Sequence, residues 1–168
     1  MTTPALWNIF ISIVVINTCY NWLAMNISTR GRYALRAMLD LALQSGDDPT
    51  MVKDISRRQE ISDLYLEQLF SRLKIAGLVR STRGPKGGFN LAKPPSQIRL
   101  SEILQAMEGS TAPVECVDNA RFCSRADFCI TRMVWIEMKK VMDEVLVSTT
   151  LKDLMRQVAE HEVKTFEA

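Results

Sequence analysis

The sequence predicts a mainly α-helical fold with one small β-hairpin. Two helical patterns, residues 51–59 and 63–76, are joined by a short connection. A basic, glycine-rich turn at residues 83–88 then separates two short stretches of strand character. A long amphipathic run, residues 130–146, follows a polar segment that contains three cysteines. This order indicates a winged helix-turn-helix, with the hairpin as its wing, and a long C-terminal dimerisation helix.

The composition allows a packed core and divides the chain by charge. Of 168 residues, 47% are hydrophobic and 24% are charged, which is typical of a folded protein. Residues 28–99 hold 13 Lys and Arg against 7 Asp and Glu, whereas residues 101–168 hold 8 against 12. We expect a winged-helix domain at residues 25–100. A basic domain would gain from a polyanion partner through counterion release, although a solvated basic surface has the same composition.

Residues 1–24 form an apolar leader without a charged residue. A signal peptide is disfavoured because no basic residue precedes Arg30. We interpret the leader as a mis-assigned start, with Met25 as the native one, and keep a membrane segment as the alternative. With Met25 as the start the protein is expected to be cytoplasmic, with no membrane partner and no role for Cys19.

The first two helices are predicted from their apolar positions. An amphipathic run from Tyr33 to Leu43 forms the first helix, and Arg30, Arg32 and Arg36 lie on its polar side as candidate phosphate contacts. Thr50 is expected to cap the second helix at residues 51–59.

The third helix, residues 63–76, is the candidate DNA-reading element. Ser62 is its expected N-cap, and Gly77 is its expected left-handed stop. In a helix-turn-helix, this helix places its N-terminal residues at base edges. Gln pairs with adenine, Glu accepts from cytosine, and Arg reaches guanine or a phosphate. The alternative is that these polar residues only keep a surface helix soluble. The candidates are Ser62, Asp63, Tyr65, Glu67, Gln68 and Arg72.

The hairpin supplies the basic part of the predicted surface. Arg80, Arg83 and Lys86 lie on or beside its glycine-rich turn. An arginine on a thin hairpin suits the negative potential of a narrow minor groove. A nucleotide-binding loop is disfavoured, because the glycine spacing is wrong and no helix opens after the turn.

The C-terminal part, residues 101–168, is predicted to combine a polar loop with dimerisation helices. Ser101 is expected to cap a helix at 102–107, which Gly109 ends. The loop at 110–129 has no regular period. The helix at 130–146 carries a wide apolar stripe, which a second subunit would cover in a homodimer, although packing on its own domain is the alternative. A final helix starts after Thr150 with Asp153 in a capping box and runs to about Glu162.

Three cysteines in the loop are candidate metal ligands. Cys116, Cys123 and Cys129 have six and five residues between them. Structural disulfides are disfavoured in a cytosolic protein, whereas thiols from one loop can bind a soft metal centre. An iron–sulfur cluster, a thiol redox switch and a zinc site all remain open from the chemistry alone.

The chain also resembles a known family. The stretches TRGRYALRAMLDLAL, DISRRQEIS, YLEQLFSRL and GLVRSTRGPKGGF, with the C-x6-C-x5-C loop, are similar to the iron–sulfur-sensing members of the Rrf-type winged-helix regulators. The resemblance runs from Met25 to about Leu154. It implies a homodimer that binds a double-stranded DNA operator as repressor or activator. It also implies a [2Fe–2S] cluster, with [4Fe–4S] possible, control of cluster-assembly or iron and redox genes, and no enzymatic activity or small-molecule substrate.

The resemblance also assigns roles by position. It makes Cys116, Cys123 and Cys129 the cluster ligands and gives operator discrimination to Glu67. Ser62, Tyr65 and Gln68 would contact bases or phosphates, and Arg83 would enter the minor groove. The family's cluster-binding members have a histidine three residues after the third cysteine as fourth ligand. Here that residue is Arg132, which cannot ligate iron. The expected substitutes are a small thiol, a residue of the other subunit, or one of Glu115, Asp118 and Asp127.

Overall fold

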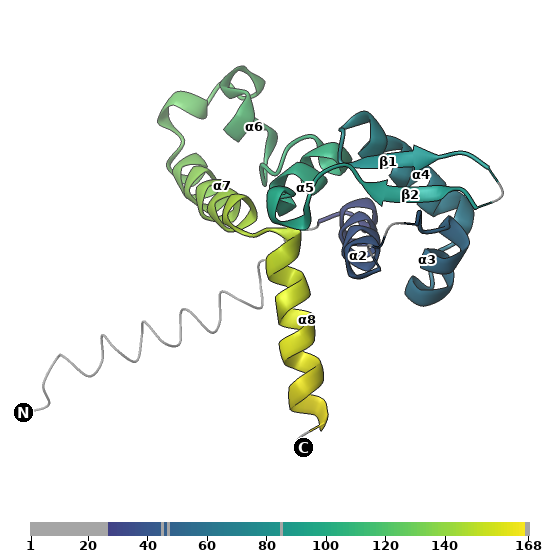
Figure 1. Cartoon of the computed structure of the whole chain (residues 1–168). Helices are drawn as coiled ribbons and strands as arrows, with labels where there is room; N and C mark the ends of the chain where they lie inside the picture. Colours follow the sequence, from purple (N-terminus) through teal and green to yellow (C-terminus); the bar gives the residue numbers. More distant parts are fainter. Residues whose placement is uncertain (1–26, 45, 47, 85, 167–168) are drawn as a thin grey trace, which may run out of the picture.

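The computed structural model describes residues 27–166, apart from 45, 47 and 85. The predicted leader at 1–24 and the proposed start at Met25 lie outside these residues. Among the described residues, no helix has the length and apolar character needed to cross a membrane. The helices and strands are α2 (Thr29–Leu43), α3 (Val52–Gln59), α4 (Asp63–Ile75), β1 (Val79–Thr82), β2 (Gly88–Leu91), α5 (Leu100–Glu108), α6 (Glu115–Asp118), α7 (Ile130–Ser148) and α8 (Leu151–Phe166) (Figure 1).

The first helix starts four residues before its predicted start at Tyr33. Ser28 is the N-cap, and its hydroxyl accepts from the backbone N–H groups of Arg30 and Gly31 at 3.1 and 3.4 Å. The inward face also differs from the prediction, because Leu43 is 43% exposed. Three alanines lie on this face, and their small side chains allow other helices to approach α2 closely. Its fully or almost fully buried apolar residues are Ala34, Ala37, Met38, Leu41 and Ala42.

Thr50 does not cap the second helix, as the sequence had suggested. Met51 is the N-cap of α3, without a side-chain hydrogen bond. Thr50 instead pairs with Phe89 through two backbone hydrogen bonds, of 3.0 Å from its own N–H and 2.9 Å from the N–H of Phe89. The residue therefore attaches the base of the hairpin to the helical unit.

The connection between α3 and α4 contains an uncommon backbone conformation. Glu60 has a φ of 54°, the one positive φ of a non-glycine residue among those described. Ser62 occupies the predicted N-cap position of α4, but its side chain makes no capping hydrogen bond. At the other end Gly77 has the predicted left-handed φ of 70°, and α4 stops there.

The hairpin packs on α4 and completes the core of the winged-helix unit. Its strands are antiparallel, with Val79 opposite Leu91 and Thr82 opposite Gly88. The ring of Phe70 stacks on that of Phe89 with centroids 4.5 Å apart and planes inclined by 16°. The inward face of α4 is apolar, and its buried residues are Leu66, Leu69, Phe70 and Leu73. The predicted fold class is confirmed.

The C-terminal helices follow the predicted order with shifted ends. Helix α5 begins at Leu100 with Arg99 as its N-cap, and so Ser101 lies inside it. Gly109 ends it, with a φ of 80°. The predicted capping box of α8 is present, since the N–H of Thr150 donates to Asp153 at 3.0 Å and the N–H of Asp153 donates to the Thr150 hydroxyl at 3.3 Å. Helix α8 runs beyond Glu162 to Phe166 and packs against α2.

Candidate nucleic-acid interface and cysteine segment

Helix α4 presents a polar face to solvent opposite its buried leucines. The side chains of Ser62, Glu67, Gln68 and Arg72, four of the predicted base or phosphate contacts, are exposed. An open hollow of about 430 Å³ lies on this face, lined by Leu64, Glu67, Gln68, Ser71 and Arg72. Tyr65 differs from the others, because it is half-buried and meets the ring of Tyr33 edge-on. The exposed face has the donors and acceptors that reading base edges requires.

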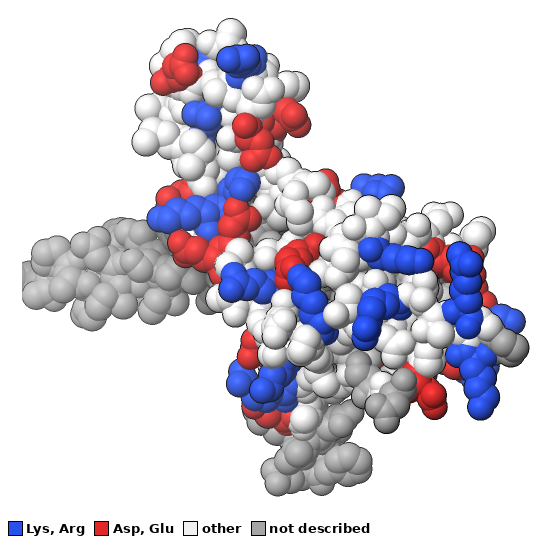
Figure 2. Space-filling view, turned by 45° about the horizontal axis from the view of Figure 1, so that its top comes forward, with Lys and Arg blue, Asp and Glu red and all other residues white. Residues whose placement is uncertain are grey.

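The wing extends this surface with basic side chains. Arg83 and Lys86 are exposed at the turn between β1 and β2, where Gly84 has a φ of 120°. Lys74 near the end of α4 donates to the hydroxyl of Ser81 on β1 at 2.6 Å, which links the helix to the wing. Figure 2 shows Lys and Arg side chains gathered over the side of the molecule that carries α3, α4 and the hairpin.

The three arginines at the start of α2 have partners within the chain. Arg30 lies 4.0 Å from the carboxylate of Glu108, and Arg32 donates to Thr29 at 3.2 Å. Arg36, which the sequence suggested as a phosphate contact, donates through Nε to the side-chain oxygen of Gln59 at 3.2 Å. The guanidinium of Arg36 therefore bonds the last residue of α3.

The cysteine segment, residues 110–129, is more ordered than the predicted loop. It contains the short helix α6 and two 3-10 turns, Ala120–Phe122 and Ala126–Phe128. Cys116, Cys123 and Cys129 are half-buried, and none is in a disulfide. In the part of the chain that the structure describes, no group of three or more Cys, His, Asp or Glu side chains is arranged to hold a metal ion. The ligand role of these cysteines therefore stays a prediction.

Arg132 connects the first and third cysteines. Its Nε donates to the carbonyl oxygen of Cys116 at 2.8 Å, and its backbone N–H donates to that of Cys129 at 3.1 Å. The Sγ of Cys129 lies 3.2 Å from the hydroxyl oxygen of Thr131, and this hydrogen bond is the main cause that lowers the pKa of Cys129 below its ordinary value. From the sequence, Arg132 was recognised only as the residue that occupies the position of the expected histidine ligand. No local sequence pattern indicated its contact with Cys116.

Comparison with known proteins places these features in one family. The family model described as Rrf2, iron-dependent transcriptional regulator, matches residues 27–157, which include the helix-turn-helix, the wing and the cysteine segment. The chain belongs to the Rrf2 family. This confirms the resemblance inferred from the motifs. Rrf2 proteins are transcriptional regulators, and the predictions of a DNA-binding regulator and of a non-enzyme are confirmed with it.

The similar proteins within the Rrf2 family carry three different names: rrf2, IscR and CymR. Protein rrf2 of Nitratidesulfovibrio vulgaris is 41% identical over 80% of this chain and 90% of that protein. The regulator IscR of Photobacterium profundum is 42% identical over 79% of this chain and 76% of that protein. Among solved structures, T. potens IscR has a TM-score of 0.67 at 40% identity, covering 80% of this chain and 88% of that chain. CymR of B. subtilis, described as the global cysteine regulator, has a TM-score of 0.65 at 41% identity, covering 77% and 95%.

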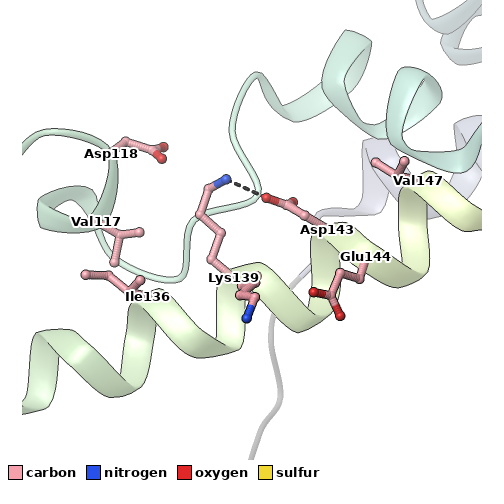
Figure 3. A pocket seen from close by; sticks show the side chains of 8 residues that line it. Val117, Asp118, Ile136, Lys139, Asp143, Glu144 and Val147 are labelled. Carbon is pink, nitrogen blue, oxygen red and sulfur yellow. Dashed lines mark hydrogen bonds and ion pairs between the residues drawn. The ribbon is translucent and has the colours of Figure 1, made fainter.

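In this Rrf2 chain, the start of the cysteine segment is fastened to α7. The hydroxyl of Thr111 donates to Asp143 at 2.7 Å, and Lys139 forms an ion pair with the same carboxylate at 2.6 Å. Figure 3 shows Lys139 pointing to Asp143. Both residues line an open hollow of about 580 Å³, which Val117 and Asp118 of α6 also line. Asp143 is thus a shared acceptor between the segment and the helix.

Acid is expected to loosen this attachment. Burial raises the pKa of Asp143, but the hydrogen bonds from Lys139 and Thr111 outweigh it and hold the pKa below the ordinary 3.8. A lowered pKa in the folded state means that the attachment is complete above pH 3.8 and is lost as the pH falls through the lowered value. Hydrogen exchange of residues 110–118 should therefore accelerate in this range. Asp143→Asn should remove the dependence, and Glu144→Gln on the same helix should retain it; an unchanged profile in Asp143→Asn would contradict this role.

Proposed function

We propose that this Rrf2 regulator senses iron–sulfur cluster status through Cys116, Cys123 and Cys129 and controls genes of cluster assembly or of iron and redox metabolism. The observation that carries the proposal is the set of three half-buried thiols outside any disulfide, all within one segment. The cysteine segment is attached to Asp143 and Arg132 of α7, and these contacts support transmission of a structural change from the segment to the rest of the molecule. The similarity to IscR proteins points the same way.

The donor set fits a cluster in its chemistry. Three thiolates suit iron, and a guanidinium cannot replace the missing fourth ligand. We infer that Arg132 instead keeps Cys116 close to the start of α7, since its Nε donates to the Cys116 carbonyl. A bound cluster would supply a centre whose occupancy follows iron and oxygen. We expect [2Fe–2S], with [4Fe–4S] as the second possibility and Glu115, Asp118 or Asp127 as candidate fourth ligands.

Anaerobic purification with iron and sulfide analysis and Mössbauer spectroscopy tests this proposal. We expect an iron-to-sulfide ratio of about one, with the signature of one cluster type. Cys116→Ser, Cys123→Ser and Cys129→Ser should each lose the cluster, whereas Ser124→Ala beside Cys123 should keep it. Protein that contains no iron, or zinc in its place, would contradict the proposal and leave the DNA-binding function intact.

A thiol redox switch is the second candidate, favoured by the similarity to CymR and by the lowered pKa of Cys129. In this case two thiols would give two electrons and two protons to hydrogen peroxide, and an S–S bond and two water molecules would form. Mass spectrometry of peroxide-treated, iron-free protein would find a disulfide among the three cysteines and a parallel change in DNA binding. Peroxide-treated protein with all thiols still reduced would contradict this candidate.

We infer that α4 enters the major groove while Arg83 of the wing enters the adjacent minor groove. Glu67→Ala should relax operator choice by about 1–3 kcal/mol of discrimination, because a carboxylate accepts from cytosine and repels acceptor edges. Sequence selection from a randomised duplex library measures it. Arg83→Ala should instead weaken binding of the selected duplex. Ser71→Ala in the same hollow is the control, and selection by Glu67→Ala identical to wild type would contradict the role of Glu67.

We further propose that α7 pairs with α7 of a second copy in a homodimer. Leu146 is the only buried residue along α7, all of which is described, whereas Val134 and Val141 are 54% and 52% exposed. Packing on its own domain, the alternative expected from the sequence, accounts for Leu146 and Met142, which belong to or contact the core, but not for these exposed positions. Further exposed apolar residues on the helix are Ile130, Met133, Ile136, Val145 and Val147.

Val141→Glu is expected to convert the dimer to a monomer, because it places a carboxylate inside an apolar interface. Analytical ultracentrifugation measures the change. Lys140→Glu is the control, because it adds the same carboxylate one position away. The side chain of Lys140 is already charged and pairs with Glu137 at 3.7 Å, so this variant should leave the dimer intact. Equal sedimentation of wild type and Val141→Glu would argue against this interface.

A further inference from the structure

A buried carboxylate lies where α2 meets the end of α3. Asp40 is only 5% exposed, and it is the buried charged side chain of the described core. Arg58 donates to it from Nε at 3.0 Å and from a terminal nitrogen at 2.7 Å. Gln59, the last residue of α3, donates to it from Nε2 at 3.0 Å. A carboxylate with this many charged and polar donors fixes the last turn of α3 against α2.

The amide of Gln59 passes this constraint on to Arg36. Because its nitrogen donates to Asp40, its oxygen faces the other way and accepts from Nε of Arg36 at 3.2 Å. A terminal nitrogen of Arg36 also donates to the backbone carbonyl of Gln59. Arg36 and Asp40 are one turn apart on α2 and therefore hold Gln59 from two sides. We call these contacts the Asp40–Gln59–Arg36 network.

The same arginine reaches the beginning of α4 through two aromatic rings. The guanidinium carbon of Arg36 lies 5.5 Å from the ring centroid of Tyr33. Tyr33 meets Tyr65 edge-on, with centroids 6.0 Å apart and planes inclined by 85°. Tyr65 belongs to the first turn of α4. Residues of α2 therefore hold both sides of the helix-turn-helix connection.

The connection closes α3 with backbone hydrogen bonds, since the N–H groups of Glu60 and Ile61 both donate to the carbonyl oxygen of Ser56. Glu60 has a left-handed backbone without being glycine, a conformation that persists only where the surroundings impose it. Ser62 does not cap α4 with its hydroxyl. These local bonds end α3 but do not reach α4, so the angle between α3 and α4 also depends on the tertiary contacts from α2. Base reading requires side chains placed to within about 0.5 Å.

We propose that Arg36 and Gln59 are positioning residues that set the orientation of α4 and thereby operator discrimination, and that Arg36 is not a phosphate contact. The proposal rests on the DNA-binding function of the family. It predicts a specific signature. Loss of either residue lowers affinity for the operator much more than affinity for unrelated DNA, because non-specific binding depends on phosphate contacts that tolerate a tilted helix.

The test uses the full chain and two duplexes: one selected by the wild-type protein from a randomised library, and a scrambled one of equal length and composition. Arg36→Ala and Gln59→Ala should each bind the selected duplex about tenfold more weakly, the loss expected for one misplaced base contact. Affinity for the scrambled duplex and the salt dependence should stay unchanged. The double variant should be no weaker than the weaker single one, because both residues act through one contact.

Three further variants keep the proposal falsifiable. Arg36→Lys retains the charge but cannot bond both oxygens of Gln59 in the same way, and should show the selective loss. Gln44→Ala, at the exposed C-terminal cap of the same helix, should show none. Asp40→Asn should reproduce the selective loss if it remains folded by thermal unfolding. Two outcomes would make Arg36 a phosphate contact and overturn the proposal. In the first, Arg36→Ala loses equal affinity for both duplexes, and the slope of log affinity against log salt concentration falls by about 0.9. In the second, Arg36→Lys behaves like the wild type. A wild-type protein that binds no duplex would instead refute the DNA-binding function.

Discussion

Phe70→Ala is expected to lower the free energy of unfolding by about 3–5 kcal/mol, the range for truncating a buried aromatic side chain. Phe70 is fully buried, and its ring stacks on Phe89 at 4.5 Å. It therefore joins α4 to β2, and the cavity left by its removal lies between this helix and the hairpin. Urea denaturation followed by circular dichroism measures the loss as a lower midpoint at a similar slope.

The chain offers a matched control for this substitution. Phe122 in the cysteine segment is 69% exposed. Phe122→Ala should therefore change the free energy of unfolding by no more than about 0.5 kcal/mol, as exposed positions usually do. A similar loss in both variants would mean that the packing of Phe70 against the hairpin does not carry the stability assigned to it.

Gly88→Ala is expected to displace the wing. An added Cβ would lie 2.2 Å from the carbonyl oxygen and 2.6 Å from the carbonyl carbon of Thr50, and 3.0 Å from the nitrogen of Met51. All three are backbone atoms, so relief requires the hairpin to move away and the Thr50–Phe89 pairing to break. We expect a stability loss of about 1–3 kcal/mol or more, together with weaker DNA binding as Arg83 shifts.

Gly46→Ala separates this steric effect from the general effect of removing a glycine. A Cβ at Gly46 would have no neighbour within 4 Å. This variant should keep both wild-type stability and wild-type DNA affinity, measured by thermal unfolding and by fluorescence anisotropy with the selected duplex. Wild-type behaviour of Gly88→Ala would show that the hairpin base tolerates a side chain and that the close approach to Thr50 has no consequence for the wing.

The features that the sequence predicted correctly depend on local rules. Gly77 and Gly109 end helices because both adopt a positive φ, and Thr150 with Asp153 forms its capping box within one turn. The failures involve residues that have distant partners. Thr50 has the side chain of a cap, but its backbone pairs with Phe89, far along the chain. The preference of threonine for helix N-caps takes no account of such a distant contact.

The residues of the candidate site were also predictable where local rules determine them and not where distant partners do. The period of buried leucines fixed which face of α4 is exposed, and with it Glu67, Gln68 and Arg72. The function of Arg36 was not predictable, because its partner Gln59 lies 23 positions away. One signal was available and was missed: a charged residue, Asp40, in the middle of an apolar helix face indicates a buried partner.

The packing of α8 against α2 has a consequence for how the protein is made. Helix α2 ends at Leu43, whereas α8 begins only at Leu151. At about 5–20 residues per second, the ribosome needs roughly 5–20 s to add the chain between them. Throughout this interval the nascent winged-helix half lacks one wall of its core. The surface of α2 that α8 covers in the finished fold therefore stays exposed until the last helix has been synthesised.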